Sequence, residues 1–172
     1  MSRDDHNEPR THRLRPGVRI AAVVSTYHHD VTGTMLDSAA DTLEAAGLAP
    51  GSLHEILVPG SFEMPLVAGR LARRADVDAV LCFGLVLKGE TEHDRYIAAA
   101  VSEGLMRVAL DADKPVLFGV LTCSTLEQAR ARARREVDGG LDKGREVARA
   151  AIALLAALEE ADGKVRRLEE TG

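Results

Sequence analysis

Short apolar runs alternate with amphipathic stretches along this chain. Four runs predict strands: VRIAAVVS (18–25), SLHEILV (52–58), DAVLCFGLV (78–86) and VLFGVLT (116–122). The first is continuous enough to predict a strand that is covered on both faces. Apolar residues at helical spacing predict helices over about 32–46, 62–75, 93–111, 125–135 and 143–161. Strands and helices therefore follow one another in regular alternation.

This alternation predicts an α/β fold, because helices that connect parallel strands through right-handed crossovers cover both faces of a sheet. We expect a three-layer, flavodoxin-like arrangement with a four-stranded parallel sheet in the order 2-1-3-4. Within the second helix, Pro65 is tolerated only because it falls in the first turn. Ser124 and Glu127 have the spacing of a capping box at the start of the fourth helix.

The ends of the chain are polar and lack this pattern. We expect a flexible N-terminal tail or arm over 1–17, one folded domain over 18–161, and a frayed C-terminal tail over 162–172. The length of 172 residues and the 45% hydrophobic content suit a single core.

Charge and cysteine usage narrow the class of protein. The net charge is −5 and no basic block is interleaved with aromatic residues, which argues against a nucleic-acid partner. Cys82 and Cys123 lack metal-ligand spacing and indicate small buried side chains in a reducing compartment. The sequence shows neither an apolar span of membrane length nor a signal-peptide core, so we expect a cytoplasmic protein without a membrane partner.

Every unusual polar cluster follows a predicted strand. The segments are STYHHD, PGSFE, LKGETEH and CST, in chain order. Because ligands bind outside the carboxyl ends of parallel strands, four such loops at one sheet edge predict one binding site.

The LKGETEH segment could bind an anion. Gly89 allows close backbone approach, Thr91 offers a hydroxyl, Lys88 adds charge, and the next helix presents free N–H groups. An ordinary strand-to-helix loop has the same composition and remains the alternative. The chain carries neither GxxxxGK[ST] nor GxGxxG, so a nucleotide phosphate loop is not indicated.

Several single side chains have both a structural and a chemical interpretation. His93 is either a helix-start histidine or a proton shuttle, and His28 and His29 are rivals for that role. These histidines do not make a good metal-ligand set. Glu63 either serves a helix N-terminus or, with the loop before it, holds a polyhydroxylated ligand. Tyr27 lies in a polar loop and is a candidate for stacking on a flat ring.

Four longer segments together resemble the lumazine synthase family. They are VPGSFEMPLVAGRLA, DAVLCFGLVLKGETEHDRYIAAAVSEGL, KPVLFGVLTCSTLEQARARA and DKGREVARAAIAL. The likeness runs from about Val18 to Ala157, in the same order and with nearly the same spacing. The combination of PG-[SA]-FE-x-P, G-E-T-x-H and F-G-V-L-T-x-x-T-x-E-Q-A is specific.

The resemblance implies a reaction in riboflavin biosynthesis. 5-Amino-6-(D-ribitylamino)uracil condenses with 3,4-dihydroxy-2-butanone 4-phosphate to give 6,7-dimethyl-8-ribityllumazine, phosphate and water. The enzyme would be a transferase that uses no cofactor and no metal. Two alternatives remain: a non-catalytic lumazine- or flavin-binding paralogue on the same fold, and a generic flavodoxin-like module for FMN or a phosphate.

The resemblance also implies roles for individual residues, with His93 as the catalytic proton-transfer group. For the pyrimidine substrate, Tyr27 would stack on the ring. The ribityl chain would be bound by Ser61, Phe62 and Glu63. The uracil edge would be bound by the backbone of Leu85, Val86 and Leu87. The phosphate would be bound by Lys88, the turn of Glu90 and Thr91, and Arg132. Phe118 and Arg132 would come from the neighbouring subunit, and Lys143 would lie near the same interface.

Three departures from the family pattern bear on these expectations. Thr26-Tyr27-His28 stands where Arg-Phe-Asn or Arg-Trp-Asn is usual, and Lys88 stands where arginine is common. The link RREVDGGLD is longer than the compact link that accompanies sixty-subunit shells. We therefore expect a homo-oligomer with active sites at subunit interfaces, a pentamer rather than a 60-mer shell.

Overall fold

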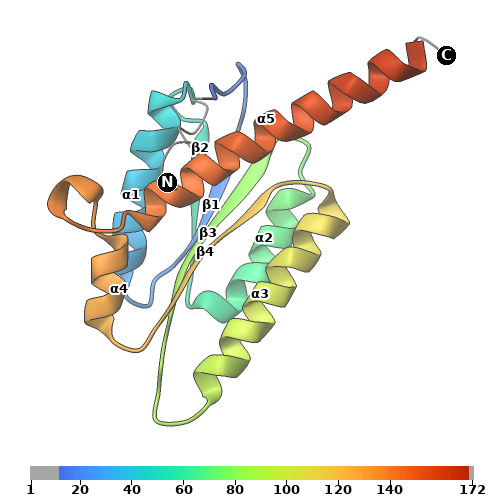
Figure 1. The fold of residues 1–172 in the computed structure, drawn as a ribbon. Helices are drawn as coiled ribbons and strands as arrows, with labels where there is room; N and C mark the ends of the chain where they lie inside the picture. The colour runs from blue at the N-terminus through green and yellow to red at the C-terminus, as the bar shows by residue number, and fades with distance from the viewer. Residues whose placement is uncertain (1–11, 171–172) are drawn as a thin grey trace, which may run out of the picture.

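The structure is a computed structural model that describes residues 12–170, with only the helical backbone described for 164–170. Within this range, four parallel strands form the centre of the molecule (Figure 1): β1 (Ile20–Ser25), β2 (Leu53–Val58), β3 (Ala79–Leu87) and β4 (Val116–Cys123). Their order is β2-β1-β3-β4 and each neighbouring pair is parallel. The predicted fold class and strand order are confirmed.

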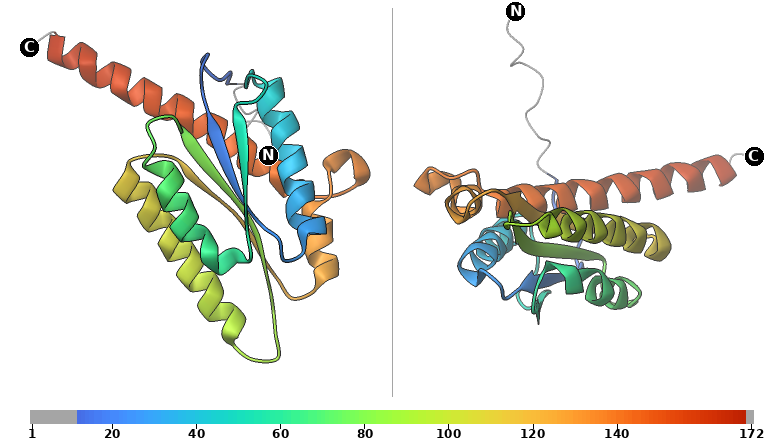
Figure 2. Two further views of the ribbon diagram at one scale, coloured as in Figure 1. Left: turned by 180° about the vertical axis from the view of Figure 1, so that it is seen from behind. Right: turned by 90° about the horizontal axis from the view of Figure 1, so that it is seen from below.

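Helices cover both faces of this sheet (Figure 2). The helices α1 (His29–Ala45), α4 (Leu126–Ala133) and α5 (Lys143–Glu170) pack on one face, and α2 (Met64–Ala72) and α3 (His93–Ala112) pack on the other. Short 3-10 turns, η1 (Ser61–Glu63) and η2 (Glu136–Asp138), precede α2 and follow α4. This three-layer arrangement leaves the carboxyl ends of the strands at one edge of the molecule.

Alternate residues of the strands supply two separate cores, although the middle of the edge strand β2 is exposed. In β1, Ile20, Ala22 and Val24 point into the cluster shared with α1 and α5, whereas Ala21 and Val23 point into the cluster under α2 and α3. Both sets are buried, as the continuous apolar run predicted.

The two cysteines belong to these cores. Cys82 and Cys123 are both free and buried, as expected for small apolar side chains. Burial raises the pKa of the Cys82 thiol to about 12, so this thiol stays protonated and unreactive near neutral pH.

Three predicted boundaries were wrong. The second helix does not begin at Phe62 and end near Ala75, because η1 occupies 61–63 and α2 ends at Ala72. The N-cap of α4 is Thr125 rather than Ser124: the Thr125 hydroxyl accepts the N–H of Gln128 at 3.2 Å, and the Gln128 side chain accepts the N–H of Ser124 at 3.1 Å.

The third correction concerns the C-terminus. The frayed tail expected over 162–172 is helical as far as Glu170, because α5 continues well past 161. Residues 171 and 172 lie outside the described residues. Among the described helices, none combines the length and the apolar character needed to cross a membrane.

The expected N-terminal tail is partly ordered. Residues 1–11 lie outside the described residues, but the Leu14 N–H donates to the Ala46 carbonyl at 2.9 Å and the Leu14 side chain packs against the core. Residues 12–17 are therefore fastened to the domain rather than free.

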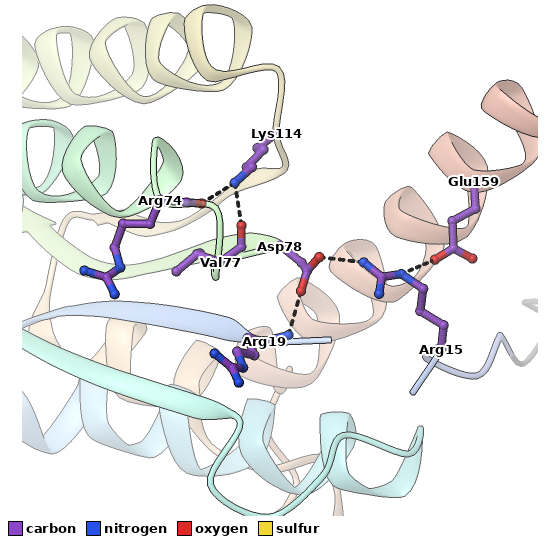
Figure 3. A network of polar contacts seen from close by, with 7 residues as sticks. All are labelled: Arg15, Arg19, Arg74, Val77, Asp78, Lys114 and Glu159. Atoms are coloured by element: carbon purple, nitrogen blue, oxygen red, sulfur yellow. Dashed lines mark hydrogen bonds and ion pairs between the residues drawn. The ribbon is translucent and has the colours of Figure 1, made fainter. Parts of the chain in front are cut away.

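A polar network fastens the amino-end edge of the sheet (Figure 3). Asp78 accepts the Arg19 N–H at 2.8 Å and pairs with Arg15 at 2.6 Å, and Arg15 also pairs with Glu159 of α5 at 3.0 Å. Close by, Lys114 donates to the Val77 carbonyl at 2.7 Å. The N-terminal segment, the start of β3 and α5 are thereby joined at one place.

Asp78→Ala is expected to lower the free energy of unfolding by about 1–2 kcal/mol, because it removes the acceptor of the Arg19 N–H as well as the ion pair. Asp78→Asn keeps an acceptor and should cost less than about 1 kcal/mol, since exposed ion pairs contribute little. Denaturant unfolding of both variants measures the difference. Equal losses would show that the charge, not the backbone hydrogen bond, carries the effect.

Candidate active site

The loops that follow β1 and β2 lie side by side at the carboxyl edge. Strand pairing continues beyond the strands, because the Thr26 N–H donates to the Val58 carbonyl at 2.8 Å and the Tyr27 N–H to the Pro59 carbonyl at 3.2 Å. The Thr26 hydroxyl also donates to the Pro59 carbonyl at 3.2 Å. Tyr27 is thereby held above the PGSFE turn.

The Tyr27 ring lies directly against Gly60. A Cβ atom built on Gly60 would meet Cδ2 of Tyr27 at 3.3 Å and Oε2 of Glu63 at 3.1 Å, so a side chain there would displace one of them. Tyr27 is 69% exposed. Most of the ring is therefore free to contact a planar ligand.

The PGSFE turn fastens itself to β3. Glu63 accepts the Gly60 N–H at 3.0 Å, and the buried Ser61 hydroxyl donates to the Leu85 carbonyl at 3.3 Å. Two of the three residues assigned to ribityl binding, Ser61 and Glu63, thus have partners within the chain, whereas the third, Phe62, is 60% exposed. These contacts within the chain hold the turn in place without a ligand.

Two glycines, Gly60 and Gly84, allow close contacts that shape this turn, and neither was among the residues predicted from the sequence. A Cβ atom on Gly84 would lie 2.5 Å from the Ser61 hydroxyl oxygen, so β3 needs glycine where Ser61 crosses it. The signal was present in the strand CFGLV, since an isolated glycine inside a strand indicates a close approach.

The loop between β3 and α3 is open. Lys88, Glu90 and Thr91 are exposed, and among the described residues Lys88 and Glu90 have no side-chain hydrogen bond or ion pair. His93 is exposed at the first residue of α3, with its N–H 3.4 Å from the Thr91 hydroxyl oxygen. A cationic and an imidazole side chain are therefore both available to a ligand at this loop.

The backbone of this loop is joined to β4. The Lys88 N–H donates to the Cys123 carbonyl at 2.9 Å. Leu85 and Val86 are buried and Leu87 is partly buried, so only their backbone groups can face a ligand at this strand end.

Arg132 lies near the end of β4 but on the other side of the sheet. Burial raises the pKa of the Cys123 thiol, and the nearby Arg132 guanidinium partly opposes this rise. Arg132 is half-buried on α4 and donates to the Gln128 carbonyl at 3.3 Å. Its helix packs on the α1 and α5 face, whereas His93 belongs to a helix of the opposite face.

Phe118 and Lys143 are also set apart from the loops. Phe118 lies in the middle of β4, opposite Cys82 in the register, and is 46% exposed along the free edge of the sheet. Lys143 is the first residue of α5 and pairs with Glu146 at 2.5 Å. The single chain therefore divides the predicted site residues into two groups.

The sequence profile of the 6,7-dimethyl-8-ribityllumazine synthase family matches residues 17–159. The synthase of that name from Salinibacter ruber (strain DSM 13855 / M31) is 42% identical over 147 residues, which cover 86% of this chain and 92% of the relative. The one from Thermus thermophilus is 43% identical over 143 residues, 83% of this chain and 89% of the relative. This chain belongs to the 6,7-dimethyl-8-ribityllumazine synthase family.

The resemblance found in the sequence motifs is thus confirmed. As a member of the lumazine synthase family, the chain is an enzyme of riboflavin biosynthesis, a transferase that forms 6,7-dimethyl-8-ribityllumazine. The matched segment contains all four loops of the carboxyl edge together with Phe118, Arg132 and Lys143. The last turns of α5 lie beyond it.

Within residues 12–170, no three His, Cys, Asp or Glu side chains gather in positions that could hold a metal ion. The carboxyl edge of this lumazine synthase family member presents the exposed Tyr27 ring, the Lys88 ammonium group and the His93 imidazole.

Proposed function

We propose that the carboxyl edge of the sheet is half of the lumazine-forming site and that a neighbouring subunit supplies the other half. The proposal rests on the separation of the predicted site residues into two groups within one chain. Tyr27 and His93 lie with the open loops, while Arg132 lies on a helix of the opposite face and Phe118 on the free edge of β4. A second chain placed against that edge brings the two groups together.

The pyrimidine substrate is held first by its ring. Tyr27 stacks on the aminouracil, and the backbone of Leu85, Val86 and Leu87 hydrogen-bonds the uracil edge. The ribityl chain lies along the turn of Ser61, Phe62 and Glu63. The Ser61 hydroxyl donates to the Leu85 carbonyl, but its oxygen can still accept a ribityl hydroxyl proton.

The phosphorylated substrate is held by charge. The ammonium group of Lys88 and the backbone N–H groups of the Glu90–Thr91 turn face the phosphate from one subunit. The guanidinium of Arg132, assisted by Lys143, faces it from the neighbour. Guanidinium and phosphate form paired charge-assisted hydrogen bonds, and the same contacts stabilise phosphate as it departs.

The reaction is a series of proton transfers between two reactive substrates. The 5-amino group attacks the ketone, and water leaves to form an imine. Loss of a neighbouring proton expels phosphate, tautomerisation follows, and attack by the ribitylamino nitrogen with loss of water closes the ring. His93 moves these protons, because imidazole exchanges protons near neutral pH. Orientation of the two substrates supplies much of the rate.

We further propose a pentamer in the cytoplasm. The free edge strand exposes Phe118, and α3 exposes Tyr96, Met106 and Leu110, which are apolar surfaces suited to subunit contacts. The long link from Arg134 to Asp142 argues against the compact link of shell-forming relatives. Two buried free thiols fit a reducing compartment.

Mixing two damaged variants tests the shared site. His93→Ala and Arg132→Ala subunits, unfolded together and refolded as mixed oligomers, should recover activity well above either variant alone. In a randomly mixed ring, about one quarter of the interfaces pair an intact His93 with an intact Arg132. Lumazine absorbance measures activity, and light scattering of the same sample should give a mass of about five chains.

Each variant refolded by itself is the control and should show no gain. A site contained within one chain would leave the mixture no more active than its components, which would rule out the shared arrangement. A mass near that of sixty chains would rule out the pentamer.

A further inference from the structure

A cavity of about 770 Å³ lies away from the carboxyl-edge loops, between α1, α5 and the link that joins α4 to α5. Its apolar lining includes the small side chains of Ala45, Ala46 and Ala153, together with Ile152. A cavity of this size is large enough for a nucleotide-sized molecule. None of the residues assigned above to substrate binding or proton transfer lines it.

The link that walls this cavity is held in place by Asp142. The buried Asp142 carboxylate accepts the Ser38 hydroxyl of α1 at 2.5 Å and the N–H groups of Glu136 at 3.3 Å and Arg145 at 3.2 Å. Burial acts to raise the pKa of Asp142, but these hydrogen bonds outweigh it and hold the pKa below its ordinary value. These hydrogen bonds therefore hold the link in place against α1 and α5.

Four arginines line the cavity, against three carboxylates. Arg135 pairs with Asp41 and Arg145 with Glu136, each at 2.5 Å, while the third carboxylate, Asp142, is engaged by the hydrogen bonds just described. Within the described residues, Arg13 and Arg149 have no side-chain partner.

The unpaired guanidinium groups give the cavity a positive lining in a chain whose net charge is −5. Unpaired guanidinium groups beside an apolar floor match an anion that carries an apolar ring. The planar fork of arginine suits phosphate in particular, since it can donate two parallel hydrogen bonds to adjacent oxygens.

We propose that this cavity is a second ligand site, which binds a phosphate ester of nucleotide size. The phosphate lies between Arg13 and Arg149, and the ring lies on the floor formed by Ala45, Ala46, Ile152 and Ala153. The proposal is independent of the catalytic roles given above, because it rests on other residues.

Calorimetric titration of the full-length protein with adenosine 5′-monophosphate tests this site, with adenosine and inorganic phosphate titrated separately. We expect one nucleotide bound per chain and binding at least about tenfold weaker for adenosine, which lacks the charged group. Arg149→Gln should weaken nucleotide binding by about tenfold or more. Arg70→Gln, an exposed arginine of α2, is the matched control and should change nothing.

Two further variants separate this site from the catalytic one and from a folding defect. Ala153→Leu fills the floor without changing charge and should weaken the nucleotide but not inorganic phosphate. Arg132→Ala should leave nucleotide binding intact. Absence of binding, equal binding of adenosine, or binding lost in Arg132→Ala but kept in Arg149→Gln would each overturn the proposal.

Discussion

Replacing His93 by alanine is expected to slow turnover by about 10–10³-fold without abolishing it, since general acid–base catalysis rarely supplies more than about 10⁴-fold. The two substrates are already reactive toward one another, and the protein that holds them together retains its orienting contacts. His93 is exposed at the first residue of α3, so the variant should fold normally.

Steady-state kinetics across the neutral pH range measures this prediction. The variant should lose the part of the pH–rate profile that reports an imidazole, while KM for both substrates changes little. His29→Ala is the matched control, because the His29 ring packs over Gly33 of its own helix, where a Cβ atom would lie 3.0 Å away. Complete inactivity of folded His93→Ala, or equal slowing by His29→Ala, would refute the assignment.

Replacing Arg132 by alanine should raise KM for the butanone phosphate by about 10–100-fold, because a charge-assisted hydrogen-bond pair is worth about 1.5–3 kcal/mol. KM for the pyrimidine should stay close to that of the unaltered enzyme. Arg132→Lys should retain part of the affinity for the butanone phosphate. Lysine keeps the positive charge but lacks the planar guanidinium group that can donate two parallel hydrogen bonds to phosphate.

Arg130→Ala provides the comparison on the same helix. Arg130 pairs with Asp30 of α1 at 2.9 Å, so its loss disturbs a surface contact of α4 without removing the phosphate-facing guanidinium. We expect at most a few-fold effect from it, as for other exposed ion pairs. An unchanged KM for the butanone phosphate in Arg132→Ala would show that the phosphate is bound elsewhere.

The fold was predictable because β1 and β3 are continuous apolar runs that are buried almost throughout, and because helices alternate with all four strands, although the edge strand β2 is mostly exposed. The ends of elements were less predictable, because local hydrogen bonds decide them. Glu63 reaches back to the Gly60 N–H and tightens the start of the second helix into a 3-10 turn. Gln128 makes Thr125, rather than Ser124, the cap of α4. Both effects depend on side-chain geometry that spacing alone does not specify.

The position of the candidate loops at one sheet edge was predictable, but the contacts that hold these loops in place were not. Strand-end loops with Tyr27, Lys88 and His93 follow from the topology. The contacts that position them, such as that of the Ser61 hydroxyl against Gly84, depend on the distance between η1 and β3, which only the folded chain fixes. The cavity beside α5 was not foreseen, because its walls come from segments far apart in the sequence.

The length of α5 has a practical consequence. Glu159 marks the point where Arg15 ties this helix to the amino-end edge of the sheet, and the helix continues to Glu170 (Figure 2). At about 1.5 Å per residue, the remaining turns advance roughly 16 Å, on the side of the molecule opposite the catalytic loops. A fluorophore or affinity label attached at the end of α5 would therefore stand clear of the carboxyl-edge loops of its own chain, whereas one at the end of β3 would not.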